Sequence, residues 1–544
     1  MWSARQSRKM GRRVAGLLGG LLVGLLLVAA PAAAALSNVS NSALVPSGSP
    51  AIAVNKAGRV FVAWKEGSGS NFRILFRRSK PTQGICGGGL EFDEMPVSLW
   101  AGSVAPSRPA LTANDTEVFV AWQASSAVWF NRSTNDGQAF FDPVPPSPVN
   151  LGSSRSELNV PSVATDTAGR IFVAWSNGSF PAEIFLTRYP SSGGGFEPAQ
   201  PVSGTPLDSR APSLATDGTN IFLAWEESGP GPLGFLNSSI LHKKFRIDVP
   251  SLTEVASLGA TNLSTGLGRA FGPSVAFGDG FLSVVFGASN GPSFYHSLGT
   301  SNVSSSDGMS FSLPVDVSGV MTTLSPSDAR VARRNGSALV AWAQRLGQTE
   351  AADIEIRDRL LLGNGAMGSS ETVSPTPGQA ASPAAAMDST GRRLVAWQGR
   401  ETADLLNDEV YVSYNGGTDG EPMTASVEMT PQTLNAKTMY QGEGIFTLRI
   451  RVPGVGPGAI DVNNLNLKIN GQPVIGSLVP VSSSVGDADG DGTAELELKF
   501  HRRDLKDVFG GATLTTAQRD GNYTVTGNTR DGCFSGGDSV RIIH

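Results

Sequence analysis

The chain is poor in the residues that many catalytic and metal-binding sites use. Its 544 residues include only two cysteines and four histidines, so a zinc site or a histidine-centred catalytic site has little support. Neither Cys86 nor Cys533 belongs to a CxxC pattern. An exported protein could oxidise the two to one bridge, and the sequence leaves open whether they pair.

Charge and long apolar runs are also scarce. Charged residues make up 16% of the chain, and the formal net charge is −5. The first 35 residues hold five basic and no acidic side chains, which leaves about −10 for the remainder. Nucleic-acid surfaces need clustered lysine and arginine, so we expect no nucleic-acid partner. No apolar run after the N-terminal segment reaches the length of a membrane span.

Residues 1–35 have the organisation of a secretory signal peptide. Basic residues from Arg5 to Arg13 precede an apolar stretch from Val14 to Ala30, and small residues follow up to Ala35. An uncleaved membrane anchor is the alternative, because the apolar stretch is borderline in length. We predict a cleaved signal and a protein that is secreted or periplasmic, without a preference between the two.

The chain is rich in glycine and proline, with 65 and 34 residues, and it repeats one pattern seven times between residues 49 and 397. Each copy has a proline, a short apolar strand, a polar turn and a second apolar strand, which ends in Ala-Trp in six copies. The prolines are Pro50, Pro109, Pro161, Pro212, Pro273, Pro326 and Pro383. The second strands end at Trp64, Trp122, Trp175, Trp225, Phe286, Trp342 and Trp397. Self-similarity at this period indicates a repeat architecture.

A third and a fourth short strand follow the Ala-Trp of most copies, and four strands in about 55 residues suit one propeller blade. The seventh copy lacks a fourth strand, which residues 35–40 could supply to close the ring and remove its exposed edges. We predict an all-β fold with a seven-bladed β-propeller over residues 36–424. Six blades is the alternative, if the fifth or sixth copy is not a full blade.

One motif connects this pattern with a known family. Ser133-Thr-Asn135-Asp-Gly137-Gln-Ala-Phe140 matches the Asp-box, Ser-x-Asp-x-Gly-x-x-aromatic, with asparagine at the aspartate position. Weaker copies begin at Ser191 and Ser304. Residues 36–424 therefore resemble the sialidase-like superfamily with bacterial neuraminidase (BNR) repeats. In that family the Asp-box joins the third and fourth strands opposite the active site, so it marks the fold and not catalysis.

The resemblance implies a ligand site on the propeller axis, where the loops after the second strands meet the starts of the first strands. Side chains just after Ala-Trp are held by rigid strand ends and could converge on one pocket. Acids, arginines and amides in one pocket suit hydrogen bonds to hydroxyls or a carboxylate. The candidate ligand-binding residues are Lys65, Glu66, Gln123, Asn177, Glu226, Glu227, Arg345, Gln398 and Arg400. The alternative is that they are solvated loop residues.

Sialidase chemistry, as the resemblance implies it, needs three arginines around the substrate carboxylate, a Tyr–Glu nucleophile pair and an aspartic acid. The family's Phe/Tyr-Arg-Ile-Pro motif is absent; Phe72-Arg73-Ile74-Leu75 comes closest and lies in a third strand. The catalytic residues are unknown. We predict an exported, monomeric, non-catalytic propeller that binds a glycan or a protein through this face. The alternative is an exo-acting glycoside hydrolase of sialidase type with degenerate motifs.

Residues 425–544 differ in pattern, because their strands alternate apolar and polar residues, which predicts a small β-sandwich. The segment Asp487-Ala-Asp489-Gly-Asp491-Gly492-Thr-Ala-Glu495 resembles the DxDxDG calcium loops of secreted β-proteins. The resemblance implies a structural calcium ion held by Asp487, Asp489, Asp491, the Thr493 carbonyl and Glu495. A strand follows in place of a helix, so the loop is not an EF-hand. A metal-free acidic hairpin is the alternative.

Overall fold

The computed structural model describes residues 35–543, with gaps. The longer gaps are residues 81–89, 141–148, 154–159, 231–235, 255–259, 301–309, 319–325, 347–352, 401–406, 416–422, 436–443, 474–479, 488–493 and 502–519. The predicted signal segment, apart from Ala35, and Cys86 lie outside the described residues. Within them, no helix is both long and apolar enough to cross a bilayer.

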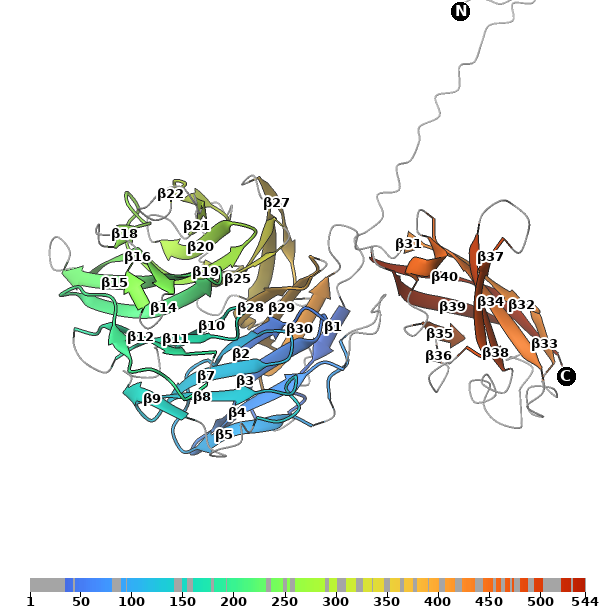
Figure 1. Ribbon diagram of the computed structural model, residues 1–544, viewed down its shortest axis with the longest axis horizontal. Helices are drawn as coiled ribbons and strands as arrows, with labels where there is room; N and C mark the ends of the chain where they lie inside the picture. Colours follow the sequence, from blue (N-terminus) through green and yellow to red (C-terminus); the bar gives the residue numbers. More distant parts are fainter. Residues whose placement is uncertain are drawn as a thin grey trace, which may run out of the picture. The chain divides into compact units, whose positions relative to one another are not determined.

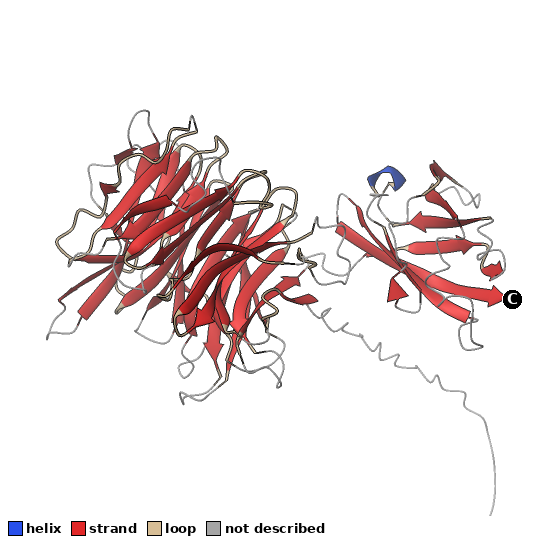
Figure 2. Cartoon of the chain, turned by 90° about the horizontal axis from the view of Figure 1, so that it is seen from below, coloured by secondary structure: helices blue, strands red, loops and turns tan. Residues whose placement is uncertain are grey.

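The predicted all-β class is confirmed. Apart from one 3-10 turn, η2 (Pro457–Ala459), the described elements are strands (Figure 2). In the repeat region the described strands form seven small antiparallel sheets, in a propeller-like arrangement (Figure 1).

Each of sheets 1 to 4 is formed by the consecutive strands of one repeat. Sheet 1 contains β2 (Ser47–Val54), β3 (Val60–Ser68), β4 (Asn71–Arg78) and β5 (Val97–Gly102). Sheet 2 contains β6 (Ala110–Ala113), β7 (Val118–Ala124), β8 (Ala127–Ser133) and β9 (Val149–Ser153). Sheet 3 contains β10 (Ser162–Thr165), β11 (Ile171–Ser176), β12 (Ile184–Tyr189) and β13 (Gln200–Pro201). Sheet 4 contains β14 (Asp208–Thr216), β15 (Asn220–Pro230), β16 (Leu236–Ile247), β17 (Leu252–Glu254) and β18 (Thr261–Asn262).

Sheets 5 and 6 continue this order, whereas sheet 7 takes one strand from the N-terminal side. Sheet 5 contains β19 (Ala270–Gly278), β20 (Phe281–Ala288), β21 (Ser293–Thr300), β22 (Ser310–Phe311) and β23 (Val315–Asp316). Sheet 6 contains β24 (Pro326–Arg334), β25 (Ser337–Arg345), β26 (Ile354–Leu361) and β27 (Met367–Thr372). Sheet 7 contains β28 (Ala381–Met387), β29 (Arg393–Gly399), β30 (Glu409–Asn415) and β1 (Ala35–Asn38).

The second strand of each sheet is apolar on both faces because it packs between two neighbours. Trp122 of β7 shares a core with Phe61 and Phe76 of sheet 1, and Trp64 of β3 shares one with Val412 of sheet 7. The same arrangement recurs along the repeat region, so each core joins two consecutive sheets. These tryptophans are at most 2% exposed.

Strand β1 lies antiparallel to β30, with Leu36 opposite Ser413 (Figure 1). The carboxylate of Glu409, the first residue of β30, holds the segment that follows β1. It accepts hydrogen bonds from the Ser40 hydroxyl and, at 3.1 Å, from the Ser42 backbone N–H. The expected N-terminal segment is therefore the outer strand of sheet 7.

The sixth repeat corrects one prediction. Arg330 pairs with Ala341 as Ala51 pairs with Ala63 in sheet 1, and both first strands have a register shift just before that pair. This register places Ala329, and not Pro326, at the position of the other prolines. The predicted position of the repeat proline in this copy is therefore wrong by three residues, because Pro326 precedes the equivalent position, which Ala329 occupies.

The Asp-box turn after β8 is held by its own side chains. The Ser133 hydroxyl donates to Asn135 Oδ1 (2.9 Å) and accepts from the Gly137 N–H (3.0 Å). Phe140 then lies 4.6 Å, centroid to centroid, from Phe76 of sheet 1 in an edge-to-face contact. Most of the copy beginning at Ser304 lies outside the described residues.

The described C-terminal region forms two sheets that share one core. One contains β31 (Met423–Thr424), β33 (Thr433–Asn435), β35 (Asn466–Ile469), β36 (Gln472–Pro473), β39 (Asp520–Thr529) and β40 (Gly532–Ile543). The other contains β32 (Ser426–Thr430), β34 (Ile445–Arg451), β37 (Ser482–Gly486) and β38 (Glu495–His501). Leu448 and Leu498 of the second sheet pack with Val525 and Phe534 of the first.

Candidate functional site

The first strands of several sheets begin at a common point. The Arg108 guanidinium, just before β6, donates to the Pro50 carbonyl of sheet 1 (3.0 Å) and to the Ser382 carbonyl of sheet 7 (3.1 Å). It also forms an ion pair of 2.9 Å with Asp328 of sheet 6. We call this end of the repeat region, where first strands begin and second strands end, the loop face.

Burial and the nearby cation Arg330 lower the pKa of Arg108 to about 10, and the Asp328 carboxylate opposes this shift. Arg108 therefore remains charged at neutral pH. Its donors are directed at backbone carbonyls of other sheets, so its role is to hold the first strands together. Isolated buried charges are costly unless paired and hydrogen-bonded, and Arg108 is both.

Further half-exposed arginines lie at the loop-face ends of sheets 1, 4, 6 and 7, and each is paired with an acid of its own sheet. Arg73–Glu66 is an ion pair of 2.6 Å in sheet 1, and Arg330–Asp328 (2.7 Å) and Arg400–Asp408 (2.7 Å) lie in sheets 6 and 7. The remaining pairs are Arg210–Asp208 in sheet 4 and Arg357–Glu355 in sheet 6. The arginine side chains are 27–50% exposed and their partners 6–29%. A guanidinium has five N–H donors, so a pair with one carboxylate leaves donors for a ligand.

Glu66 and Glu227, two predicted ligand residues, are buried and engaged within their sheets. Glu227 accepts from the Trp225 indole N–H (2.8 Å) and from the Ser209 hydroxyl (2.6 Å). Glu66 accepts from the Ser47 hydroxyl (3.2 Å) in addition to Arg73. Both carboxylates therefore stabilise the loop-face ends of their own sheets through hydrogen bonds.

Among the predicted residues, Glu226 is the most accessible carboxylate and Arg400 the most accessible guanidinium. Glu226 lies opposite Arg210 in the β14–β15 register and accepts from the Gly272 N–H of sheet 5 at 3.4 Å. Arg400 is exposed. Gln398 is half-buried and links two sheets, because it accepts from the Ser49 N–H (3.1 Å) and donates to Asp408 (2.8 Å).

The other predicted ligand residues also lie at this end of their sheets. Lys65, three residues before the end of β3, and Arg345, the last residue of β25, are half-buried. Asn177, just after β11, accepts from the Glu183 N–H (3.0 Å), and Gln123 is 2% exposed. The structure thus places all nine at the loop face and leaves Glu226 and Arg400 the most accessible carboxylate and guanidinium among them.

The sequence did not lead us to several charged residues of the loop face, because the predicted site residues were mainly those that follow Ala-Trp. Arg108, Arg210, Asp328 and Arg330 lie within two residues of the repeat proline or its equivalent, Ala329. The sequence does contain a signal for them, because the first strands begin near the repeat proline and therefore at the same end of the sheets. No single sequence shows which of these charges pair.

The proposed calcium ligands are only partly described. Asp489, Asp491 and Thr493 lie outside the described residues. Asp487 follows Gly486, which pairs with Glu495 across the β37–β38 ladder, so the first and last members of the motif lie at one end of this hairpin. The described residues contain no group of three potential metal ligands.

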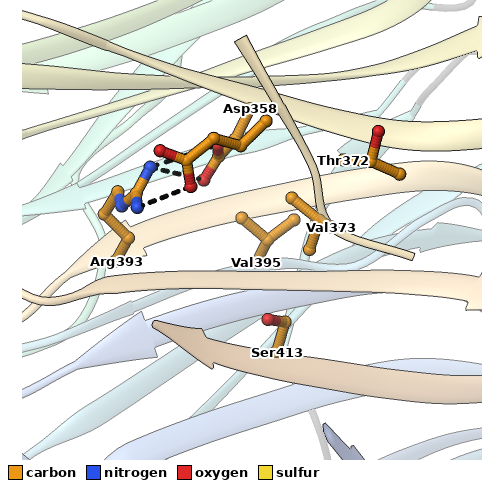
Figure 3. Close-up of a pocket in the computed structure, with 7 residues that line it drawn as sticks. Asp358, Thr372, Val373, Arg393, Val395 and Ser413 are labelled. Carbon is orange, nitrogen blue, oxygen red and sulfur yellow. Dashed lines mark hydrogen bonds and ion pairs between the residues drawn. The ribbon is translucent and has the colours of Figure 1, made fainter. Parts of the chain in front are cut away.

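A small cavity of about 20 Å³ lies between sheets 6 and 7, away from the loop face (Figure 3). Arg393, the first residue of β29, reaches Asp358 of β26 (3.2 Å) and Glu371 of β27 (2.9 Å). Burial raises the pKa of Asp358 to about 6, against the lowering effect of Arg393. The cavity is large enough for a water molecule but not for a sugar.

No family model matches the chain, and no curated protein matches it. Among solved structures, a protein of unknown function from Dyadobacter fermentans is 12% identical, with a TM-score of 0.41, over 70% of this chain and 98% of that one. A polysaccharide lyase of family PL25, an ulvan lyase, is 12% identical with a TM-score of 0.45, over 71% and 96%. The Aleuria aurantia lectin is 9% identical with a TM-score of 0.35, over 60% and 97%. Such values are too low to indicate a shared activity.

Proposed function

We propose that the seven sheets are the blades of one closed propeller of the sialidase-like type. Each first strand contacts that of the next sheet, and β28 contacts β2. The core around Trp64 joins sheet 7 to sheet 1, and Arg108 connects sheets 1, 2, 6 and 7. The turn at Ser133 supports the resemblance to BNR repeats.

We propose that the loop face binds a glycan and does not catalyse its cleavage. The observation that carries this proposal is the set of half-exposed arginines, each paired with an acid that is more buried than the arginine in four of the five pairs. Paired guanidiniums keep a fixed orientation and donate to hydroxyl or carboxylate oxygens. A sugar chain offers such oxygens along its whole length, so several subsites could engage it together.

The carboxylates argue against hydrolysis. Glycosidases need one carboxylic acid and one carboxylate on either side of the scissile bond, whereas Glu66 and Glu227 are engaged in hydrogen bonds within their sheets. One observation favours the alternative of an exo-acting glycoside hydrolase: Glu226 is partly exposed beside Arg210.

A glycan array tests the binding proposal with the full mature chain. We expect saturable binding to at least one oligosaccharide class, weakened tenfold or more by Arg210→Ala or Arg400→Ala. Lys80→Ala is the control, since Lys80 is an exposed cation at the opposite end of β4, paired with Glu91 at 3.0 Å. Hydrolysis of arrayed glycosides that Glu226→Gln abolishes would favour the enzyme, and no binding at all would contradict the proposal.

We also propose a structural calcium ion at the β37–β38 turn, held by Asp487, Asp489, Asp491, the Thr493 carbonyl and Glu495. Carboxylates at alternate positions with a glycine turn suit a hard cation. Added EGTA should lower the temperature at which the C-terminal region of the full chain unfolds, and excess calcium should restore it. An unchanged transition in EGTA would exclude the site.

A further inference from the structure

In three sheets a basic side chain of the third strand holds the outer strand of the neighbouring sheet. The side chain donates to the carbonyl of the valine that directly follows that outer strand. We call this contact a clasp. The three clasps are Arg77 to Val39 (2.7 Å), Lys243 to Val202 (3.1 Å) and Arg359 to Val317 (2.7 Å), which join sheet 1 to 7, sheet 4 to 3 and sheet 6 to 5.

In sheet 6 the clasp residue also contacts a thioether. Nη1 of Arg359 lies 3.8 Å from Sδ of Met367, the first residue of β27 in the same sheet. A thioether is only a weak hydrogen-bond acceptor. Nε of Arg359 is buried and has no hydrogen-bond partner among the described residues. The guanidinium therefore has donor capacity that its surroundings leave unused.

The sulfur of Met367 belongs to an exposed residue. Met367 is 44% exposed and Met95 is 78% exposed, whereas Met387 and Met429 are at most 5% exposed. Oxidation of a buried methionine places a polar oxygen in the core and disrupts packing. At an exposed methionine the oxygen does not enter a core, so its effect depends on the groups beside it.

We propose that Met367 is an oxidation site and that its sulfoxide tightens the clasp between sheets 5 and 6. The oxidant is a peroxide: the thioether sulfur gives up two electrons, the O–O bond breaks, one oxygen becomes the S=O oxygen and the other leaves in water. The sulfoxide oxygen is a stronger acceptor than the thioether, and bonds from a charged donor are the strong ones. Arg359 then holds both Val317 of sheet 5 and β27 of sheet 6. This inference does not depend on glycan binding.

Mild treatment of the full mature chain with hydrogen peroxide tests the site. A Met95→Leu background removes the more exposed sulfur, and peptide mass spectrometry locates the added oxygen. We expect oxidation at Met367 before Met387 or Met429. The melting temperature should rise by about 1–2 °C, as one added hydrogen bond would produce in a domain of this size. Methionine sulfoxide reductase should reverse the rise.

Matched variants separate this contact from other effects of peroxide. Met367→Leu in the same background should show no rise, and Met367→Gln, whose amide oxygen is a permanent acceptor, should raise the melting temperature without oxidant. In a folded Arg359→Leu variant, oxidation of Met367 should bring no rise. If peroxide leaves Met367 unoxidised, the site is wrong. If oxidised Met367 leaves the melting temperature unchanged or lower relative to treated Met367→Leu, the tightened clasp is wrong.

Discussion

We call the interface between two consecutive sheets a seam. At the seam between sheets 1 and 2 the third strand places an apolar residue at one position, and at the seam between sheets 6 and 7 it places a charged residue at the equivalent position. Phe76 lies opposite Ala63, and Asp358 lies opposite Ala341, so the two residues occupy equivalent registers. Phe140 of sheet 2 packs on Phe76. At the other seam Arg393 reaches Asp358 beside a water-sized cavity (Figure 3).

The difference follows from how sheet 7 is assembled. Phe140 comes from the turn that follows the third strand of sheet 2. Sheet 7 takes its outer strand from residues 35–38, so no such connection exists between its third and outer strands to supply an aromatic. We call an aromatic side chain such as Phe140, which packs on the third strand of the preceding sheet, a plug. A sheet assembled from both ends of the repeat region therefore leaves a polar cluster where a continuous sheet places an apolar plug.

The seam between sheets 4 and 5 is intermediate. His242 occupies the same register, opposite Ala224, and Phe311 of sheet 5 packs on it at 5.0 Å. Its Nε2 is buried and has no hydrogen-bond partner among the described residues. Burial, followed by the nearby Lys244, lowers the pKa of His242 to about 3.

Removing the plug should have the largest effect. Phe140→Ala leaves a cavity against Phe76 and should lower the free energy of unfolding by about 3–5 kcal/mol. Urea unfolding followed by tryptophan fluorescence measures this loss. Phe140→Leu is the matched control and should recover more than half of it; a loss below 1 kcal/mol would mean that the seam does not depend on the plug.

Breaking the polar seam should cost somewhat less, and the cost should depend on pH. Arg393→Ala leaves Asp358 buried without its cation, which at pH 7.5 should cost about 3 kcal/mol. At pH 5 the cost should be smaller, because Asp358 is then mostly protonated. Equal losses at the two pH values would show that the charge on Asp358 does not matter.

Asp358→Asn isolates the titration itself. The pKa is near 3.8 in the unfolded chain and raised to about 6 in the folded one, so the folded state binds the proton more tightly. Native stability should therefore fall relative to Asp358→Asn by about 2–3 kcal/mol between pH 4 and pH 7. If the ion pair with Arg393 dominated instead, the difference would have the opposite sign.

The smallest effect at neutral pH should come from His242→Phe, which converts the intermediate seam to the apolar type. The unsatisfied Nε2 disappears, and we expect a gain of about 1 kcal/mol at pH 7.5. The gain should grow as pH falls from 6.5 toward 5, because only the unfolded chain protonates the histidine of the native protein. A gain independent of pH would contradict the lowered pKa.

The sequence predicts the parts of the molecule that repeat. The Ala-Trp strands and the N-terminal strand that completes sheet 7 follow from period, apolar runs and the missing fourth strand. The register of the sixth repeat does not, because only the ladder shows that Ala329 replaces a proline.

The loop face illustrates the same limit. Position after Ala-Trp predicts which side chains lie at that end, but not that Glu227 is taken by an indole or that Arg108 bridges four sheets. These contacts join residues far apart in the chain, and a single sequence contains no record of such pairs.

A cross-strand disulfide tests the closed ring on which the comparison of seams depends. In a background without Cys86 and Cys533, the pair Ser37→Cys and Val412→Cys faces across the β1–β30 ladder, at a Cα separation suited to a disulfide. Ser37→Cys with Ser413→Cys is the control, because adjacent residues of a strand point to opposite faces. We predict that oxidation links residues 37 and 412, detected by mass spectrometry, and raises the melting temperature. Failure of this pair to link, or equal linkage of the control, would contradict the ring.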